Sequence, residues 1–412
     1  MSAANVEAVP LARLAEAYGT PLYVYSRAAL RQAYGALKEA LLPFDPLICY
    51  AVKANGNLSI IREFAELGAG ADVVSEGEIK RALAAGVDAG KIIFSGVGKS
   101  RHAMEEAAVA GIYQFNVESI PELHLLNAVG REQGRKLPIA LRVNPDVDPR
   151  THAKIATGHK ESKFGIEMTQ IGLALDAVRG LPHVDLCGLA VHIGSQLTEL
   201  EPFDLAFATV AGLVRDWRAA GFDIRRLDIG GGIGIRYRDE SLIDLSAYAG
   251  LIGKHFGKLD LRLALEPGRF LVGPAGILLS RVMIVKPGVA KNFLIIDAAM
   301  NDLIRPAMYD AWHDIVPVNA PPGAATENWE VVGPVCETGD LFGHDRPLPA
   351  PAPGDLVAIL SAGAYGASMS STYNARTLVP EVMVDGDQFA LIRRPVGIEE
   401  QIAWDVAPVW SR

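Results

Sequence analysis

Short apolar runs alternate with helical patterns over the first two thirds of the chain. Eight runs lie at residues 47–52, 71–74, 91–96, 113–117, 139–143, 187–193, 226–230 and 263–266. Between them, apolar positions recur as in a helix that packs one face against a sheet, for example over residues 60–67. Eight β-then-α units over about 250 residues predict a (β/α)8 barrel, whose active site lies at the carboxyl ends of its strands. A doubly wound sheet is the alternative, because strand order cannot be read from a sequence.

Local signals mark the starts and ends of the intervening helices. Ser75 with Glu78, and Ser119 with Glu122, fit the capping box at two helix starts. The expected helix ends carry glycine, at Gly86, Gly111 and Gly130.

Beyond about residue 272, strand-like runs replace the helical spacing. They lie at residues 282–287, 292–297, 329–335 and 356–363, and a hairpin over 381–392 follows with Asp385-Gly386 at its turn. These runs predict a C-terminal, mainly β domain, in which the proline-rich stretches 319–326 and 346–355 are surface loops. Residues 22–25 are a candidate strand that could pair with this domain. We therefore expect an N-terminal segment at 1–30 that packs with the β domain, a barrel at 31–275 and the β domain at 276–412.

Composition narrows the classes of function. Half of the residues are hydrophobic and 21% are charged, which is typical of a globular protein. The net charge of −9 and the lack of a basic block disfavour nucleic acid and anionic membranes as partners, and no apolar stretch approaches the roughly 20 residues that span a bilayer. The N-terminus lacks the pattern of a secretory signal, and Cys49, Cys187 and Cys336 are too far apart to suggest a disulfide framework. A cytoplasmic protein that acts on a small molecule is the expectation.

Three side chains end predicted strands at the expected barrel mouth. Lys53 follows the first run in YAVKAN, where desolvation would favour a neutral amine able to form a Schiff base, although a lysine extending to water is the alternative. Glu266 ends the eighth run in EPGR and could keep a pyridine nitrogen protonated, or form a surface pair with Arg269. His192 ends the sixth run and could stack on a planar cofactor, or be a core histidine.

A glycine cluster, GGGIG at 230–234, follows the seventh run. Successive glycine N–H groups suit a phosphate, and barrels commonly bind phosphate in the loops after strands 7 and 8, where this cluster and Gly268-Arg269 fall. A turn that needs positive φ is the alternative, and it explains one glycine better than three. The cluster comes too late and has the wrong spacing for a dinucleotide motif. The nine histidines lack a metal-ligand spacing, so we assign no metal.

The β domain carries further candidates for ligand binding. Arg305 and Tyr309 share one face if their segment is helical, and Arg305 could grip a carboxylate or be a solvated arginine. Cys336, followed by Glu337, could donate a proton or be inert packing. Tyr365 is flanked by glycines that would allow a ligand to approach closely.

Together these motifs resemble the diaminopimelate decarboxylases, pyridoxal-phosphate enzymes of the alanine-racemase-like barrel class. YAVKAN, HIGSQ, GGGIG, EPGR, MNDLIRP, GPVCET and AGAYG occur in the order found in that family, between residues 21 and 373. The resemblance implies decarboxylation of meso-2,6-diaminopimelate to L-lysine and CO2, the last step of lysine biosynthesis, by a homodimer with shared active sites. The one departure noted is Ala299, where the family usually has glycine, and it lies beside a motif.

The resemblance also implies a role for each candidate residue. Lys53 would carry the cofactor, His192 would lie on the face of its ring and Glu266 would pair with the pyridine nitrogen. The other cofactor contacts would be Ser195, Gly230, Gly231, Gly232, Pro267, Gly268, Arg269 and Tyr365. The substrate contacts would be Arg269, Arg305, Tyr309, Glu337 and Tyr365, and Cys336 would be the catalytic cysteine contributed by the second subunit.

Other functions of the same fold stay open as alternatives. An ornithine- or arginine-type decarboxylase binds a cationic tail, which Arg305 would repel, whereas Arg305 with Glu337 suits a zwitterionic tail. An amino-acid racemase is disfavoured because that related family commonly has arginine in the place of Glu266. A non-enzymatic barrel protein is disfavoured because Lys53 and Glu266 are both present.

Overall fold

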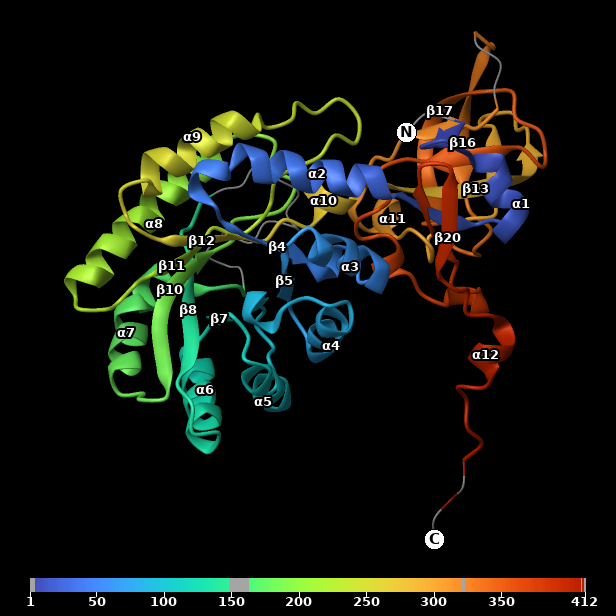
Figure 1. Cartoon of the computed structure of the whole chain (residues 1–412). Helices are drawn as coiled ribbons and strands as arrows, with labels where there is room; N and C mark the ends of the chain where they lie inside the picture. The colour runs from blue at the N-terminus through green and yellow to red at the C-terminus, as the bar shows by residue number, and fades with distance from the viewer. Residues whose placement is uncertain (1–3, 148–162, 320–322, 409, 411–412) are drawn as a thin grey trace. The chain divides into compact units, whose positions relative to one another are not determined.

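The structure is a computed structural model that describes residues 4–147, 163–319, 323–408 and 410 (Figure 1). The chain forms two compact units, one of residues 30–271 and one of residues 1–29 together with 272–412. The first is a parallel β/α structure and the second is built mainly of strands. Within the described part of the chain, no helix combines the length and the apolar character needed to cross a membrane.

The strands of the first unit form a closed parallel barrel. They are β4 (Leu47–Ala51), β5 (Gly70–Val73), β6 (Ile92–Phe94), β7 (Gln114–Val117), β8 (Leu137–Asn144), β10 (Val184–Val191), β11 (Arg226–Asp228) and β12 (Arg262–Leu265), and each overlaps a predicted run. The ring closes because β8 pairs with β10 and β12 pairs with β4. Closure confirms the (β/α)8 barrel and excludes the doubly wound sheet, which has open edges. A short extra strand, β9 (Ile166–Glu167), pairs with β8 and was not predicted.

Helices follow the barrel strands and lie outside their ring (Figure 1). They are α2 (Arg27–Ala40), which begins at the unit boundary, α3 (Leu58–Glu66), α4 (Glu76–Ala84), α5 (Arg101–Ala110), α6 (Ile120–Glu132), α7 (Ile171–Arg179), α8 (Glu201–Ala219) and α9 (Leu245–Phe256). Helix α3 buries Ile60, Ile61 and Phe64, as the spacing of its apolar residues predicts.

Helices α4 and α6 begin with a variant of the predicted capping box. At α4, the Ser75 hydroxyl accepts a hydrogen bond from the Glu78 N–H at 3.2 Å, as expected. The Glu78 carboxylate, however, accepts from the N–H of Val74 at 2.7 Å, one residue before the serine that a capping box would use. The same arrangement recurs at the start of α6. Each glutamate thereby holds the carboxyl end of the preceding strand against the start of the helix.

The glycine signals for helix ends hold at two of three positions. Gly111 caps α5 with φ of 74°, and Gly86 follows α4 with φ of 92°. The prediction at Gly130 is wrong, because α6 continues to Glu132. A Cβ at residue 130 would lie 2.7 Å from the carbonyl oxygen of His183, so close packing explains this glycine.

The second unit is a mixed sheet in which an N-terminal strand is central. Its strands are β3 (Leu22–Ser26), β13 (Gly276–Lys286), β14 (Phe293–Ile296), β15 (Ile315–Pro317), β16 (Thr326–Val332), β17 (Leu341–Pro349), β18 (Leu356–Ile359), β19 (Glu381–Asp385) and β20 (Gln388–Arg393). Strand β3 lies between β13, to which it is antiparallel, and β19, to which it is parallel. Smaller elements are β1 (Asn5–Val6), β2 (Val9–Pro10), α1 (Leu11–Tyr18), α11 (Arg305–Tyr309) and α12 (Ile398–Ile402).

Successive side chains of β3 point to opposite faces of the sheet, and the two faces have different surroundings. Leu22 and Val24 join the apolar core that α1 covers. Tyr23 and Tyr25 point to the other face and are also buried, where their hydroxyls donate to the Asp302 carbonyl at 2.6 Å and to the Glu381 carboxylate at 2.7 Å. Both faces of this strand are therefore covered, one by apolar groups and one by satisfied polar groups.

Two loop predictions in this unit need correction. The stretch 346–355 is not entirely a loop, because its first four residues belong to β17. Pro347 and Pro349 are tolerated there because β17 is an edge strand, where a missing N–H need not break the ladder. In the β19–β20 hairpin, Asp385 pairs with Gln388, so Gly386 and Asp387 form the turn rather than Asp385 and Gly386. The loop predicted at 319–326 lies partly outside the described residues.

Candidate active site

Lys53 lies at the carboxyl end of a barrel strand, in a single 3-10 turn (Val52–Ala54) directly after β4. Its Nζ is 2.8 Å from Oδ2 of Asp72, at the end of the neighbouring strand β5, and the lysine side chain is 38% exposed. Asp72 is fully buried. The ammonium is therefore held at the barrel mouth by a neighbouring carboxylate rather than extending into water by itself.

Glu266 follows β12 and belongs to a buried polar network inside the barrel. Its Oε1 accepts hydrogen bonds from the Ser95 hydroxyl at 3.0 Å and from Nδ2 of Asn116 at 3.1 Å. The same Nδ2 donates to Oδ2 of Asp228 at 2.8 Å, which ties the two carboxyl groups together. Glu266 is 7% exposed, so it does not form a surface pair with Arg269.

Burial and neighbouring carboxyl groups raise the pKa of Glu266. Burial, followed by the charges of Asp228 and Asp72, raises the pKa of Glu266 well above its usual range, and Lys53 opposes this shift. Burial likewise raises the pKa of Asp228. Two carboxylates this close cannot both ionise cheaply, so Glu266 and Asp228 together keep a proton when no cation is near.

His192 follows β10 and is a neutral imidazole. Its Nδ1 accepts a hydrogen bond from the N–H of Gly231 at 3.1 Å, so that nitrogen carries no proton. Burial, together with the charges of Arg142 and Lys53, lowers the pKa of His192 well below its usual range. The remaining ring proton is therefore on Nε2, and the ring adds no positive charge to the site.

Close backbone packing explains the glycine cluster after β11. A Cβ at Gly230, Gly231 or Gly232 would lie 2.3, 2.2 or 2.4 Å from the carbonyl oxygen of a neighbouring strand end or turn. Gly230 and Gly232 also have positive φ, of 70° and 102°. The three glycines let the loop lie directly against the ends of β10 and β12, and this accounts for all of them without a ligand.

Arg269 begins a short helix, α10 (Arg269–Val272), and is almost completely buried. Its guanidinium donates to the Tyr237 hydroxyl at 2.6 Å and to the Ser195 hydroxyl at 3.2 Å. The preceding residues hold this turn against the end of β4, because Pro267 accepts from the N–H of Ala51 at 3.1 Å and a Cβ at Gly268 would lie only 3.0 Å from the Cβ of Ala54. The turn that carries the arginine is thus fixed beside the strand end that precedes Lys53.

In the second unit, Arg305 and Tyr309 lie on the short helix α11, which meets the condition for the two residues to share one face. Arg305 is 6% exposed, so it is not a solvated arginine. Asp310 ends the helix with a left-handed φ of 50°.

Cys336 and Glu337 lie on an exposed turn after β16. The turn is held from behind by Asp340, whose carboxylate accepts from the N–H groups of Val335 and Met300, both at 2.7 Å. Glu337 hydrogen-bonds the hydroxyl of Tyr373 and thereby raises the pKa of that tyrosine. The Cys336 thiol is at the surface of this unit, so buried inert packing does not describe it.

Tyr365 has a left-handed backbone with φ of 55°. The glycines around it are required by packing within the unit, because a Cβ at Gly363 would lie 2.0 Å from the carbonyl oxygen of Val272, and one at Gly366 would lie 2.6 Å from the Tyr23 hydroxyl. A left-handed tyrosine is strained and persists only where its surroundings hold it.

The structure thus gathers one set of candidates at the carboxyl ends of the barrel strands and carries another on the second unit. The barrel set contains Lys53, His192, Ser195, Gly230, Gly231, Gly232, Glu266, Pro267, Gly268 and Arg269. The second unit carries Arg305, Tyr309, Cys336, Glu337 and Tyr365.

Sequence reasoning did not single out Asp72, Ser95, Asn116 and Asp228 as parts of the site. A signal for three of them was available, because Asp72, Asn116 and Asp228 are polar residues inside otherwise apolar runs, and such residues are seldom buried without a partner. The signal does not identify the partner, which comes from a different strand in each case.

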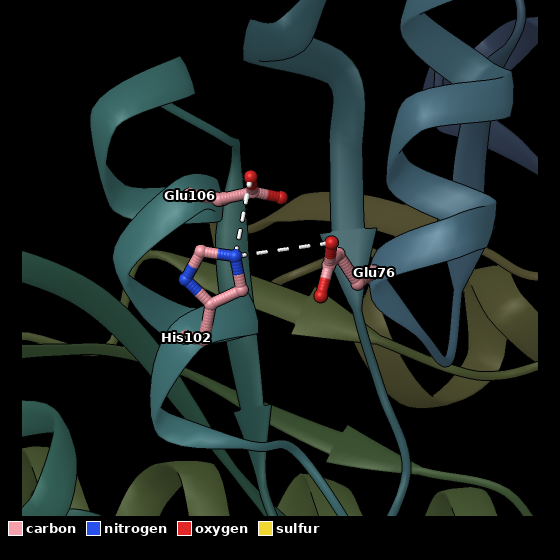
Figure 2. Close-up of side chains that lie close together, drawn as sticks. All are labelled: Glu76, His102 and Glu106. Carbon is pink, nitrogen blue, oxygen red and sulfur yellow. Dashed lines mark ion pairs between the residues drawn. The ribbon is translucent and has the colours of Figure 1, made fainter. Parts of the chain in front are cut away.

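Glu76, His102 and Glu106 form a separate polar cluster on the outer helices α4 and α5 (Figure 2). Nε2 of His102 is 3.9 Å from Glu76 and 3.5 Å from Glu106. Nζ of Lys80 is 2.5 Å from Glu76 and 3.2 Å from Glu106, so the chain itself supplies the positive charge that these carboxylates attract. We assign no metal to this cluster.

Comparison with known proteins identifies the family of the chain. Residues 27–273 match the family described as the pyridoxal-binding domain of pyridoxal-dependent decarboxylases. A diaminopimelate decarboxylase of Neisseria meningitidis is 52% identical over 401 residues, which cover 97% of this chain and 96% of the relative. The chain belongs to the diaminopimelate decarboxylase family. A family member from Pseudomonas aeruginosa is 50% identical over 397 residues, which cover 96% of this chain and 95% of that relative.

The fold is also that of this family. A crystal structure of diaminopimelate decarboxylase from Helicobacter pylori, complexed with L-lysine, is similar with a TM-score of 0.92 and 40% identity. The match covers 95% of this chain and 98% of that one. The family resemblance seen in the sequence motifs is thereby confirmed.

Proposed function

We propose that this chain catalyses the pyridoxal-phosphate-dependent decarboxylation of meso-2,6-diaminopimelate to L-lysine and CO2, the last step of lysine biosynthesis. The observation that carries the proposal is the placement of an amine, a buried carboxyl group and a buried guanidinium, from Lys53, Glu266 and Arg269, on the carboxyl ends of one barrel's strands. The L-lysine complex of the Helicobacter pylori relative supports the choice of product.

The donor chemistry of the barrel residues fits the three reactive parts of the cofactor. The amine of Lys53 suits its aldehyde, the acid of Glu266 suits its ring nitrogen, and Arg269 with the Ser195 hydroxyl suits its phosphate. Gly230, Gly231, Gly232, Pro267 and Gly268 would complete the cofactor contacts with their backbone, and Tyr365 would add one from the second unit. The carboxyl-rich interior around Glu266 favours a protonated, cationic ring nitrogen.

When bound, pyridoxal phosphate supplies an electron-withdrawing ring that stabilises the charge left on the α-carbon as CO2 departs. Glu266 would hold the ring nitrogen in its protonated form, and Asn116 fixes the Glu266 carboxyl group from behind and links it to Asp228. His192 would lie on one face of the ring as a neutral imidazole and would add no positive charge beside that nitrogen. Cys336 donates a proton from its Sγ to the carbon that lost its carboxylate.

The second unit supplies the groups that recognise the far end of the substrate. Arg305 binds the carboxylate that is retained in L-lysine, and Glu337 binds the ammonium beside it. Tyr309, one turn along α11 from Arg305, and Tyr365 line the same binding region. A cationic tail, as in ornithine or arginine, lacks the carboxylate that Arg305 needs.

The activity is tested on the purified protein with its absorbance spectrum and a product assay. We expect a cofactor absorbance band that borohydride abolishes, and the release of L-lysine and CO2 from meso-diaminopimelate. L-ornithine, L-arginine and L-alanine serve as competing substrates. Preferential turnover of ornithine or arginine, or racemisation without release of CO2, would contradict the proposal.

We propose further that the protein is a homodimer in which Lys53 of one subunit and Cys336 of the other serve the same site. The exposed turn of Cys336 and Glu337 supports this arrangement, because a second chain can reach it. Lys53→Ala and Cys336→Ala proteins are mixed after dissociation and allowed to exchange subunits. Under random pairing, half the dimers are mixed and each has one intact site, so about a quarter of all sites regain activity. Activity that stays at the mutant background, with exchange verified by a subunit tag, refutes the shared site.

We also propose that the functional domains are a barrel at 31–275 and a β domain at 276–412, with the segment 1–30 as part of the latter. The pairing of β3 with β13 and β19 supports this division.

We propose a cytoplasmic location for the protein. Its three cysteines are free thiols, and the thiol of Cys336 must stay reduced to donate a proton. Fractionation of the source cells, with assay of activity in each fraction, tests the location.

A further inference from the structure

Arg305 has a completely buried histidine as its partner. Nη1 of Arg305 is 2.8 Å from Nε2 of His313, and the other ring nitrogen of His313, Nδ1, is 2.8 Å from the carbonyl oxygen of Leu360. His313 has no exposed surface, and Arg305 is 6% exposed. The imidazole therefore bridges the guanidinium and the backbone in the interior of the second unit.

The two contacts fix the protonation state of the imidazole. A guanidinium has only donors, so Nε2 must accept its hydrogen bond and carry no proton. The single ring proton is then on Nδ1, from which it is donated to the Leu360 carbonyl. His313 thus holds Arg305 with a hydrogen bond but adds no counter-charge that would compete with an anionic ligand for the arginine.

The fold holds His313 rigidly enough to act as a support. The left-handed Asp310 reverses the chain after α11, and His313 returns to Arg305 eight residues later along the chain. Directly beyond it, Leu360 donates its N–H to the carbonyl of Asp314 at 2.8 Å, and β15 continues as an antiparallel partner of β18. The same residue, Leu360, therefore anchors both the imidazole and the backbone next to it.

We propose that His313 is a positioning residue that sets the direction of the Arg305 guanidinium and thereby the selection of substrates with a distal carboxylate. The proposal rests on the proposed function, in which Arg305 binds the carboxylate retained in L-lysine. An arginine side chain has many rotamers, and a bidentate grip on a carboxylate requires one of them, so a fixed guanidinium binds with less loss of entropy. His313 does not touch the reacting atoms, and its effect passes through Arg305.

The test compares ligands that have and lack the distal carboxylate. The parent enzyme is first assayed with meso-diaminopimelate, which decides the proposed function separately. In His313→Leu, the loss of one hydrogen bond to a charged group should raise KM for meso-diaminopimelate on the order of tenfold, with kcat changed by less than about twofold. Inhibition by L-lysine should weaken by a similar factor. Inhibition by cadaverine, which lacks that carboxylate, and the absorbance of the bound cofactor should not change.

A double-mutant cycle with Arg305→Ala separates positioning from general damage. If His313 acts through Arg305, the double variant is no worse than Arg305→Ala alone. His313→Gln keeps an oxygen acceptor for the guanidinium and should recover part of the affinity for L-lysine. His344→Leu is the matched control, since His344 lies in the same unit with a side chain that is 65% exposed, and it should leave KM unchanged.

Three results would overturn the positioning role in an enzyme that does decarboxylate meso-diaminopimelate. They are an equal loss of L-lysine and cadaverine binding, a fall in kcat at constant KM, and additive effects in the cycle. If circular dichroism shows that His313→Leu does not fold, His313→Gln takes its place in the cycle. Its smaller rise in KM must then disappear in the Arg305→Ala background.

Discussion

The carboxyl groups at the barrel mouth and those buried in the second unit have different neighbours. Asp72, Asp228 and Glu266 place three buried carboxyl groups near the barrel mouth, where Lys53 forms an ion pair with Asp72. Burial, together with the charges of Asp228 and Asp72, raises the pKa of Glu266 well above its usual range. In the second unit, buried acids lie beside arginines, as Glu381 does with Arg393 at 2.6 Å. There the pKa of Asp302 is raised by burial to about 6, with Arg376 opposing the shift.

This difference indicates what each unit is prepared to bind. An excess of buried carboxyl groups is relieved when a cation, such as a protonated ring nitrogen, arrives. The neutral His313 that contacts Arg305 adds no negative charge beside that arginine. The barrel is thus suited to the cofactor, and the second unit to the substrate tail that we propose for it.

The largest expected effect comes from removing the lysine at the barrel mouth. Lys53→Ala should abolish both turnover and borohydride-stable attachment of the cofactor, because the amine is then lost from the strand end. Lys99, another barrel lysine, is committed to Glu122 at 2.7 Å and to two backbone carbonyls. Mass mapping of the reduced adduct decides the matter, with surface variant Lys254→Ala as the control. A label on a peptide without Lys53 would overturn the assignment.

A smaller loss of activity is expected when the carboxyl group of Glu266 is replaced by an amide of the same shape. Glu266→Gln should lower kcat/KM by on the order of 10²-fold or more, because an amide cannot keep the ring nitrogen protonated. The cofactor should still bind, with a shifted absorbance band. Glu266→Asp keeps the acid on a shorter side chain and should lie between the two. Equal activity of the Gln variant and the parent would show that the excess of carboxyl groups does not serve the ring.

Removing Arg305 from the second unit should affect only the recognition of the substrate. Arg305→Ala should cost on the order of 1.5–3 kcal/mol of binding to the distal carboxylate, which is a loss of about 10- to 150-fold in kcat/KM. Loading of the cofactor should stay intact. Arg305→Lys keeps the charge without the bidentate geometry and should recover only part of the loss. Undiminished use of meso-diaminopimelate by Arg305→Ala would end the assignment of this arginine to the substrate tail.

The last expected effect concerns the stability of the fold and its dependence on pH, and turnover is not its readout. Burial raises the pKa of Glu78 from 4.5 to about 7, and Asp72 adds to the shift. The folded protein therefore binds this proton more tightly than the unfolded chain, so the contribution to stability is complete below about pH 4.5 and is lost as the pH rises through 7. Glu78→Gln, whose amide oxygen can still accept from Val74, should be more stable than the parent by about 3 kcal/mol at pH 8 and equal to it at pH 4.

Denaturant unfolding of the cofactor-free protein at the two pH values measures this difference. Glu76, on the same turn of α4, provides a control of opposite sign, because its hydrogen bond with Lys80 lowers its pKa. Glu76→Gln should be slightly less stable than the parent at pH 8, and the difference should vanish on acidification. If the stability of Glu78→Gln falls with rising pH as steeply as that of the parent, the buried Glu78 carboxyl group is not the source of this pH dependence.

Periodicity determined which segments are strands and helices. The eight barrel strands, helix α3 and the hairpin at 381–392 all follow from local spacing, because an element must bury one side of itself wherever it packs. The errors fall where a distant neighbour overrides a local signal. Gly130 does not end its helix because it makes room for His183, and prolines occupy β17 because that strand lies at a sheet edge.

The candidate site divides in the same manner. The sequence by itself singled out Lys53, Glu266 and Arg269 as candidates, since each stands in a recognisable motif at a predicted strand end. It could not place Asp228 behind Glu266, or His313 between Arg305 and Leu360. The residues in each of these contacts belong to different secondary-structure elements. Only closure of the barrel and folding of the sheet bring their atoms within hydrogen-bond distance. The sequence therefore determined which chemical groups are present, and the tertiary structure decided which of them share a proton or hold one another in place.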